Sequence, residues 1–263
     1  MRGGGHPSNK LLKGFSHVLT GLKENGLSKK HLLKDQYIGK KFKNPAFTMA
    51  EVLITLGIIG IIASMTLPAL VSKYKHKEYS ARIKKFNSMM MQAIMLSEAV
   101  NGDSKYWTHK SGAYTNENGV GVYDPVKGPE YTYEFIMTYI EPYIKYHRIE
   151  QSVKPDYSGE MMVAIYLTDG SIAYVKSAGC IDFNLDVNGD KKPNKRDYDT
   201  FVFALCPWNS TGYFDHKIKK WGALCSSSTN RNDREALIKE KRCGSRILEL
   251  SDWEFTDDYP FRL

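Results

Sequence analysis

The sequence lacks the motifs that mark the common enzyme classes. It contains no H-E-x-x-H zinc motif, no G-x-S-x-G nucleophile motif and no nucleotide-binding loop. The histidines beyond residue 46 are scattered, and we expect them to be surface or capping residues: His76, His109, His147 and His216. We therefore expect that the protein is not an enzyme and that it requires no cofactor.

Cysteine is absent before residue 180. The four cysteines that follow show no C-x-x-C spacing, which argues against a zinc site or a thioredoxin-like motif. An even number fits two disulfides in an oxidising compartment, and free buried thiols are the alternative. Cys180 and Cys206 each lie thirteen residues from Pro193, so they meet if the strands flanking that loop pair. This favours a Cys180–Cys206 bond, with Cys225–Cys243 as the second.

Acidic residues are scarce at the N-terminus, and this explains the positive net charge. Residues 1–46 contain ten Lys and Arg residues but only two Asp and Glu, so they account for the whole formal charge of +8. A protein that binds nucleic acid through a basic patch carries that charge on its folded domain. The rest of the chain is electrically balanced, and we expect no nucleic-acid partner.

The chain has one long apolar run. Residues 47–67 contain a single charged residue, Glu51, in 21 positions. As a helix they would span roughly 30 Å, the thickness of a bilayer core. Pro68 follows, and it is expected to kink the helix without ending it. We predict a transmembrane helix segment over 47–67, with membrane lipid as its surroundings.

An amphipathic pattern continues this helix over residues 68–100. Apolar side chains recur every three or four residues, and polar or charged side chains fill most of the other positions. Such a pattern is typical of a helix that packs along one side. The predicted stripe consists of Tyr79, Ile83, Phe86, Met90 and Ile94.

Residues 101–263 have the pattern of a globular domain. We predict an irregular connection to about residue 130, a helix that stops near Pro142, and a hairpin that turns at Asp169-Gly170. Two further strands are predicted over 180–185 and 200–206, followed by a tail with one short helix. The predicted fold class is α+β, a long N-terminal helix packed on a small antiparallel β-sheet.

The acidic, aromatic C-terminal end has two interpretations. Trp253, Tyr259 and Phe261 either close the core of the domain or form a recognition patch for a cargo or a neighbouring subunit. We expect the first.

In a secretory signal peptide the cleavage site follows the apolar stretch. Around residue 46 this order is reversed. Here basic residues, Lys40, Lys41 and Lys43, come first, then Ala46, and then the apolar run. Cleavage after Ala46 would give the retained helix a free amino group near Glu51. Opposite charges about 4 Å apart attract by roughly 4 kcal/mol at an effective dielectric constant near 20. That is comparable to the few kcal/mol that a charge costs inside a membrane helix.

The stretch AFTMAEVLITLGIIGIIA resembles the prepilin cleavage and methylation motif of type IV pilins and of type II secretion pseudopilins. The resemblance covers about 25 residues. It implies that a prepilin peptidase cuts between Ala46 and Phe47, methylates the new N-terminus, and leaves Glu51 as the glutamate that the family keeps near its mature N-terminus. Gly57, Gly60 and Pro68 match positions where the family often has the same residues.

Two features depart from the family pattern. The residue before the cut is usually glycine and here is Ala46, and the leader is much longer than usual, which leaves the true start codon open.

The resemblance implies a pilin-like fold and a structural role in an extracytoplasmic filament, either a secretion pseudopilus or a type IV pilus. Residues 1–46 would be a cytoplasmic leader removed on maturation, and 101–263 an extracytoplasmic pilin-like domain. The chain would await assembly in the bacterial inner membrane as a single-pass protein with its N-terminus in the cytoplasm. Its partners would be the prepilin peptidase, other pilin-like subunits and an inner-membrane assembly platform. The alternatives are a membrane-anchored binding module and a minor tip subunit that contacts substrate or DNA.

The loop between the two predicted strands carries oxygen ligands at spacings that suit calcium. It resembles the C-terminal loop of pseudopilin-like proteins, where a nearby loop binds calcium in major pseudopilins. An Asx-rich turn that satisfies its own backbone is the alternative. The candidate ligands are Asp186, Asn188, Asp190, Asp197 and Asp199.

Overall fold

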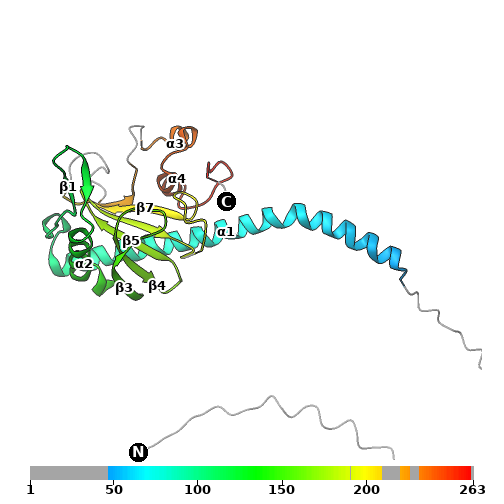
Figure 1. Cartoon of the computed structure of the whole chain (residues 1–263), viewed down its shortest axis with the longest axis horizontal. Helices are drawn as coiled ribbons and strands as arrows, with labels where there is room; N and C mark the ends of the chain where they lie inside the picture. The colour runs from blue at the N-terminus through cyan, green and yellow to red at the C-terminus, as the bar shows by residue number, and fades with distance from the viewer. Residues whose placement is uncertain (1–46, 190, 209–219, 226–230, 262–263) are drawn as a thin grey trace, which may run out of the picture. The chain divides into compact units, whose positions relative to one another are not determined.

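The computed structural model describes residues 47–189, 191–208, 220–225 and 231–261 (Figure 1). A single helix, α1 (Met49–Asn101), opens the described chain and contains Pro68 within its length. The predicted continuation of the helix beyond this proline is therefore confirmed. All five residues of the predicted stripe on its second half are buried, none with more than 6% of its surface exposed.

The domain after α1 is built on a six-stranded antiparallel sheet in the order β3-β4-β5-β6-β7-β8. Its strands are β3 (Tyr146–Val153), β4 (Met162–Leu167), β5 (Ile172–Ser177), β6 (Ile181–Asp186), β7 (Thr200–Leu205) and β8 (Trp221–Ala223). Because neighbours in sequence are neighbours in the sheet, each strand folds back on the one before it. The predicted hairpin is β4–β5, and the two predicted later strands pair as β6–β7.

Short elements surround this sheet. The helices are α2 (Lys127–Tyr139), α3 (Arg234–Glu240) and α4 (Gly244–Leu250), with 3₁₀ turns η1 (Ser104–Tyr106) and η2 (Glu141–Tyr143). A separate hairpin joins β1 (Ala113–Thr115) and β2 (Gly121–Tyr123). The coarse prediction of an α+β fold with a long N-terminal helix and an antiparallel sheet is confirmed.

The core lies between the buried stripe of α1 and one face of the sheet. Strand residues alternate between faces, so Phe183 and Phe203, which pair across β6 and β7, point to the same side. The ring of Phe86 from α1 meets Phe203 edge-on with a centroid distance of 5.3 Å, and Trp221 stacks on Phe203 at 5.4 Å. Trp253 and Tyr259 are also buried, as predicted, whereas Phe261 is only partly buried.

Three predictions about local structure were wrong. The stretch predicted as an irregular connection contains the β1–β2 hairpin, and the tail holds two short helices, α3 and α4, where one was predicted. Strands β3 and β8 were not predicted either. The β8 strand has three residues, too few for a periodicity to show, and β3 is an edge strand with mixed burial that blurs the alternation of apolar residues.

Both disulfides join the predicted partners. Cys180 precedes β6 and Cys206 follows β7, and because Ile181 pairs with Leu205 the two cysteines become neighbours. The second bond joins Cys225 and Cys243, and the chain has no free cysteine.

We expect the double substitution Cys180→Ala with Cys206→Ala to lower the free energy of unfolding by about 3 kcal/mol, because the bond closes a loop with a sequence separation of 26 residues. Urea unfolding of the full chain in detergent, followed by tryptophan fluorescence, measures the change. Reductant should destabilise the unsubstituted chain more than the double variant, and equal effects on both would contradict the assignment.

An ionic cluster fixes the end of α1 to β8. The ammonium of Lys220 lies 2.6 Å from Glu98 and 2.8 Å from Asp103. The hydrogen bond from Lys220 lowers the pKa of Asp103 from 3.8 to about 2. Burial alone would raise the pKa of Glu98, but hydrogen bonds from Lys220 and Ser104 reverse this and lower it. Both carboxyl groups therefore stabilise the folded state in their ionised form.

This cluster makes stability depend on acid pH. Since the folded pKa of Asp103 lies below its unfolded value, its contribution is complete above about pH 4 and is lost as the pH falls towards 2. We expect Lys220→Gln to lower the melting temperature at pH 7 and to flatten the fall between pH 4 and 2. Lys145→Gln, at an exposed lysine for which no ion pair is described, serves as the control. A variant with the same acid slope as the unsubstituted chain would contradict this role.

Candidate functional site

The first half of α1 exposes its apolar side chains. The most apolar 18-residue window of this helix has a mean hydropathy of 2.2, and none of it is buried against the rest of the chain. Ile54, Ile59 and Ile62, for example, each expose more than half of their surface. By length and composition, α1 is the one described helix that could cross a membrane.

Polar side chains within this apolar segment satisfy their own helix. The hydroxyl of Ser64 donates to the carbonyl of Ile61 at 2.7 Å, and that of Thr66 donates to Ile62 at 3.0 Å. An unpaired hydroxyl is costly in hydrocarbon because no water is there to bind it. The hydrogen bonds to the helix backbone remove this cost. The segment therefore suits lipid or neighbouring apolar helices as its surroundings.

Thr48 and Glu51 form a reciprocal cap at the start of α1. One carboxylate oxygen of Glu51, Oε2, accepts from the backbone N–H of Thr48 at 2.8 Å and from its hydroxyl at 2.9 Å. In return, the hydroxyl oxygen of Thr48 accepts from the N–H of Glu51 at 3.2 Å. This is the capping-box arrangement, and it satisfies polar groups that a helix N-terminus otherwise leaves open. It also holds the carboxylate at the first turn, where the helix dipole favours a negative charge.

Among the predicted assembly residues, Gly57 and Gly60 contact nothing in the described part of the chain that explains a glycine there. A Cβ added at Gly57 or Gly60 would meet no atom within 4 Å. Glycine inside a helix costs about 1 kcal/mol relative to alanine, and Pro68 removes a helical hydrogen bond. The open space around the two glycines shows no packing within the described residues that requires them, and close approach of another helix is the usual reason for glycine in such a segment. Phe47 is 84% exposed, and Ala46 lies outside the described residues.

Three of the predicted calcium ligands, Asp186, Asp197 and Asp199, accept hydrogen bonds from the chain itself. The carboxylate of Asp199 accepts from the N–H groups of Asn194 and Lys195 and from the amide of Asn188. Asp186 accepts from the N–H of Asn188, and Asp197 from the N–H of Ser245. The contacts of Asp186 and Asp199 are those of an Asx-rich turn that satisfies its own backbone, whereas Asp197 connects the loop to α4.

The same loop also has unsatisfied oxygens. The side-chain carbonyls of Asn188 and Asn194 are buried without a hydrogen-bond partner, which suits a cation or a water. Asp190 lies outside the described residues. Within the described ranges no group of three His, Cys, Asp or Glu side chains is placed to hold a metal ion. Calcium binding at this loop stays a prediction.

The histidines that the structure describes lie in packing or surface positions. His76 stacks on Phe255 with a centroid distance of 4.6 Å, and His109 stacks on Trp208 at 4.2 Å. Burial lowers the pKa of His109. His147 is exposed, and His216 lies outside the described residues.

Thr48 was not predicted as a functional residue, although the sequence carries its signal. A threonine followed three residues later by a glutamate, directly before an apolar run, is the capping-box pattern. For Glu51 we predicted only a partner created by cleavage, whereas Thr48 already provides one.

Comparison with known proteins identifies one family. A family model described as "Family of unknown function (DUF6613)" matches residues 69–263. No curated protein and no solved structure matches the chain. The matched range starts directly after Pro68, so it covers the amphipathic half of α1 and the domain that follows.

We expect Thr48→Val to loosen the first turn of α1, because removing a capping side chain costs about 1 kcal/mol. Hydrogen exchange of the full chain in detergent should become roughly fivefold faster at Glu51 and Val52, whose N–H groups donate to the hydroxyl and the carbonyl of Thr48. Thr48→Ser keeps the hydroxyl and should leave the rates unchanged. Identical rates in all three chains would show that the cap does not hold this turn.

Proposed function

The chain belongs to the family of unknown function DUF6613, and from the residues of its own N-terminal half we propose that it is a pilin-like structural subunit of an extracytoplasmic filament. The observation that carries the proposal is the exposed apolar half of α1 with its one charge, Glu51, four residues after Phe47. A helix with this surface needs an apolar partner outside the chain. Lipid meets the need before assembly, and neighbouring α1 helices meet it afterwards.

Processing between Ala46 and Phe47 is part of the proposal. A prepilin peptidase would remove residues 1–46 and leave the new amino group next to the capped carboxylate of Glu51. The carboxylate already faces the N-terminal end of the helix, because it is held by Thr48. In the mature chain the carboxylate would meet the amino group of its own chain or of a neighbour. The two opposite charges would attract each other strongly, because the surrounding medium has a low dielectric constant.

The mature chain would lie in the inner membrane with its domain outside the cytoplasm. The basic leader supports this orientation, since lysines concentrate on the cytoplasmic side of a first membrane helix. The two disulfides support it as well, because such bonds persist in oxidising compartments. A structural subunit of this kind needs neither a catalytic residue nor a cofactor.

A pilin-like fold is compatible with the observed architecture. The second half of α1 packs on an antiparallel sheet through its buried stripe, while its first half stays free. Such a division lets one helix serve both the domain and a filament core. A membrane-anchored binding module is the second candidate, and it would keep the same helix without processing.

We expect mass spectrometry of the protein from its bacterial membranes to find a mature chain of residues 47–263 with a methylated N-terminus. Glu51→Gln should be processed to the same end but should lose at least tenfold in the yield of sheared filaments, because the amino group loses its counter-charge. Glu117→Gln, at an exposed position in the β1–β2 turn, is the matched control. An intact leader on the membrane-bound protein would favour the anchored binding module.

A further inference from the structure

A groove runs along one flank of α1 where the helix enters the domain. It has a volume of about 670 Å³, and its walls come from α1, the β4–β5 turn and the loop after β6. Five cationic side chains line it: Lys75, Arg82, Arg148, Lys191 and Lys192. Two carboxylates, those of Glu78 and Asp169, face the same space. We refer to this groove as the basic groove.

Most charges in the basic groove are paired within the chain. Arg82 binds Glu78 at 2.7 Å, and Arg148 binds Glu150 at 2.6 Å. Lys192 binds Asp156. No carboxylate of the described residues forms an ion pair with Lys75 or with Lys191. These two exposed ammonium groups therefore carry the positive excess of the groove.

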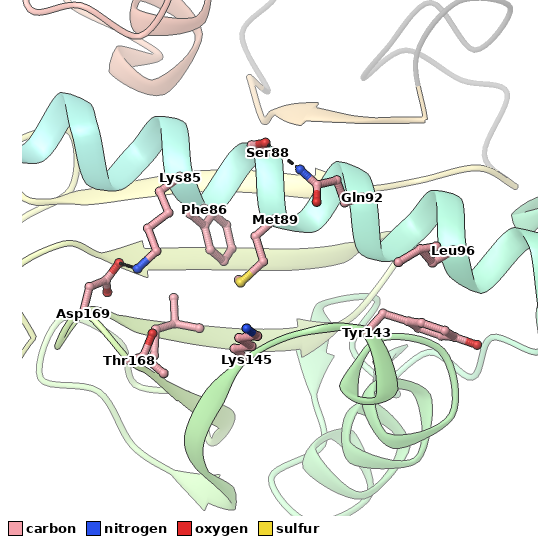
Figure 2. Close-up of a pocket in the computed structure, with 11 residues that line it drawn as sticks. Lys85, Phe86, Ser88, Met89, Gln92, Leu96, Tyr143, Lys145, Thr168 and Asp169 are labelled. Carbon is pink, nitrogen blue, oxygen red and sulfur yellow. Dashed lines mark hydrogen bonds and ion pairs between the residues drawn. The ribbon is translucent and has the colours of Figure 1, made fainter. Parts of the chain in front are cut away.

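The basic groove continues along α1 as an apolar pocket of about 370 Å³, which shares Leu167 and Asp169 with it. Figure 2 shows Lys85 reaching from α1 to Asp169, with Phe86 and Met89 on the same side of the helix. The ion pair, at 2.9 Å, neutralises the carboxylate that lies between the groove and the pocket.

The wall that carries Lys191 is fixed in place. Arg82 donates to the carbonyl of Val187 at 2.7 Å, and Asn188 donates to the hydroxyl of Tyr79 at 3.2 Å. Gly189 has φ 67° and lies so close to Gly170 that an added Cβ would come within 2.6 Å of its carbonyl oxygen. The loop and the β4–β5 turn therefore fit together only through glycine.

An acidic loop lies against the opposite flank of α1, at the same level along the helix axis as the basic groove. The hydroxyl of Ser80 donates to the carbonyl of Trp253 at 2.7 Å. The ammonium of Lys84 lies 2.5 Å from Glu254 and 3.5 Å from Asp252, so one cation pairs with two carboxylates and an excess of one negative charge remains. Asp252 and Trp253 have φ values of 52° and 62°, a region that side chains rarely adopt. This strained turn buries Trp253 while the side chain of Asp252 stays 91% exposed. We refer to Asp252 and Glu254 together as the acidic loop.

The two charged surfaces cannot meet within one copy. Successive residues of a helix are rotated by about 100°, so Ser80 and Lys84 lie on one flank while Lys75 and Arg82 lie on the other, with the buried stripe between them. Two copies placed side by side at the same height would bring one copy's acidic loop to the other's basic groove. Such a contact joins different surfaces, so it can continue from copy to copy, and it gives a filament when each copy is displaced along the axis of the one before it.

We propose that the acidic loop of one copy docks in the basic groove of the next, with Asp252 and Glu254 facing Lys75 and Lys191. This rests on the proposed function and names the lateral contact of the filament. Charge pairs at the edge of an interface set register and partner choice more than affinity. The contact would therefore fix how far one α1 slides along its neighbour, while the apolar halves of the helices supply the attraction.

A second copy fits the groove better than the membrane does. Lys75 follows the apolar run closely, and juxtamembrane lysines attract anionic phospholipid headgroups. The acidic loop instead offers two carboxylates on a rigid turn, and a rigid partner loses little freedom on binding.

Carbodiimide cross-linking of intact cells that express the full chain tests the contact, because this reagent joins a carboxylate and an amine that touch. We expect the dimer band to contain peptides that link Lys75 or Lys191 to Asp252 or Glu254. The two surfaces lie on opposite flanks of α1, so such a link can form only between copies.

Charge reversal provides the matched test. The pair Lys75→Glu with Lys191→Glu, and separately Asp252→Lys, should each lower the dimer yield at least tenfold, and all three together should restore it. Lysine tolerates the backbone at position 252, since Lys241 adopts φ 50° in this chain. Lys239→Glu, at an exposed position on α3, is the control and should change nothing.

Two results would overturn the contact. A dimer yield that the charge reversals leave unchanged would show that the two surfaces do not meet. A dimer yield that follows the anionic lipid content of the cells, and that the combined variant does not restore, would assign the groove to phospholipid headgroups. Failure of the proposed function has a different signature, an intact leader and no sheared filament from the control variant. Processing at Phe47 and normal filaments, together with charge reversals that have no effect, would contradict the proposed contact and leave the proposed function standing.

Discussion

One helix has to satisfy two surroundings, and the rest of the structure follows from this constraint. The first half of α1 presents apolar side chains on every face and finds no partner in the described chain. The second half presents them as a stripe and buries them against the sheet. The domain therefore covers only the part of α1 that lies beyond Pro68 and leaves the apolar part exposed, which under the proposed function is covered by lipid and then by other helices.

The polar groups near the exposed segment are arranged to make this division tolerable. Thr48 holds the carboxylate of Glu51 at the first turn, and Ser64 and Thr66 return their hydroxyl groups to the helix backbone. Further along, an ionic cluster around Lys220 fixes the end of α1 to β8. The one charge of the apolar half is thus held by local hydrogen bonds, whereas the charges of this cluster are paired across elements.

Periodicity predicted the elements whose burial is regular. The stripe from Tyr79 to Ile94 and the β4–β5 hairpin were predictable because a 3.6-residue and a two-residue repeat are both visible in the sequence. The disulfide pairing followed from the expected pairing of β6 with β7, since Cys180 and Cys206 lie just beyond a matched pair of residues.

Other features depend on contacts that are distant in sequence. The β8 strand exists because Trp221 packs between Phe183 and Phe203, which no local pattern reveals. The strained turn at Asp252 is set by Trp253 entering the core. The basic groove combines α1 with residues more than a hundred positions later, so its charges could be counted from the sequence but not placed.

The division of α1 into two surroundings is tested most directly by single cysteines along the helix in cells that express the full chain, where the native cysteines are all in disulfides. A membrane-impermeant maleimide is applied before and after detergent treatment. The account predicts that Ile54→Cys, Ile58→Cys and Ile62→Cys react only after detergent, whereas Lys77→Cys reacts in intact membranes exposed to the reagent from outside the cytoplasm. Equal labelling of all four positions before detergent would contradict it.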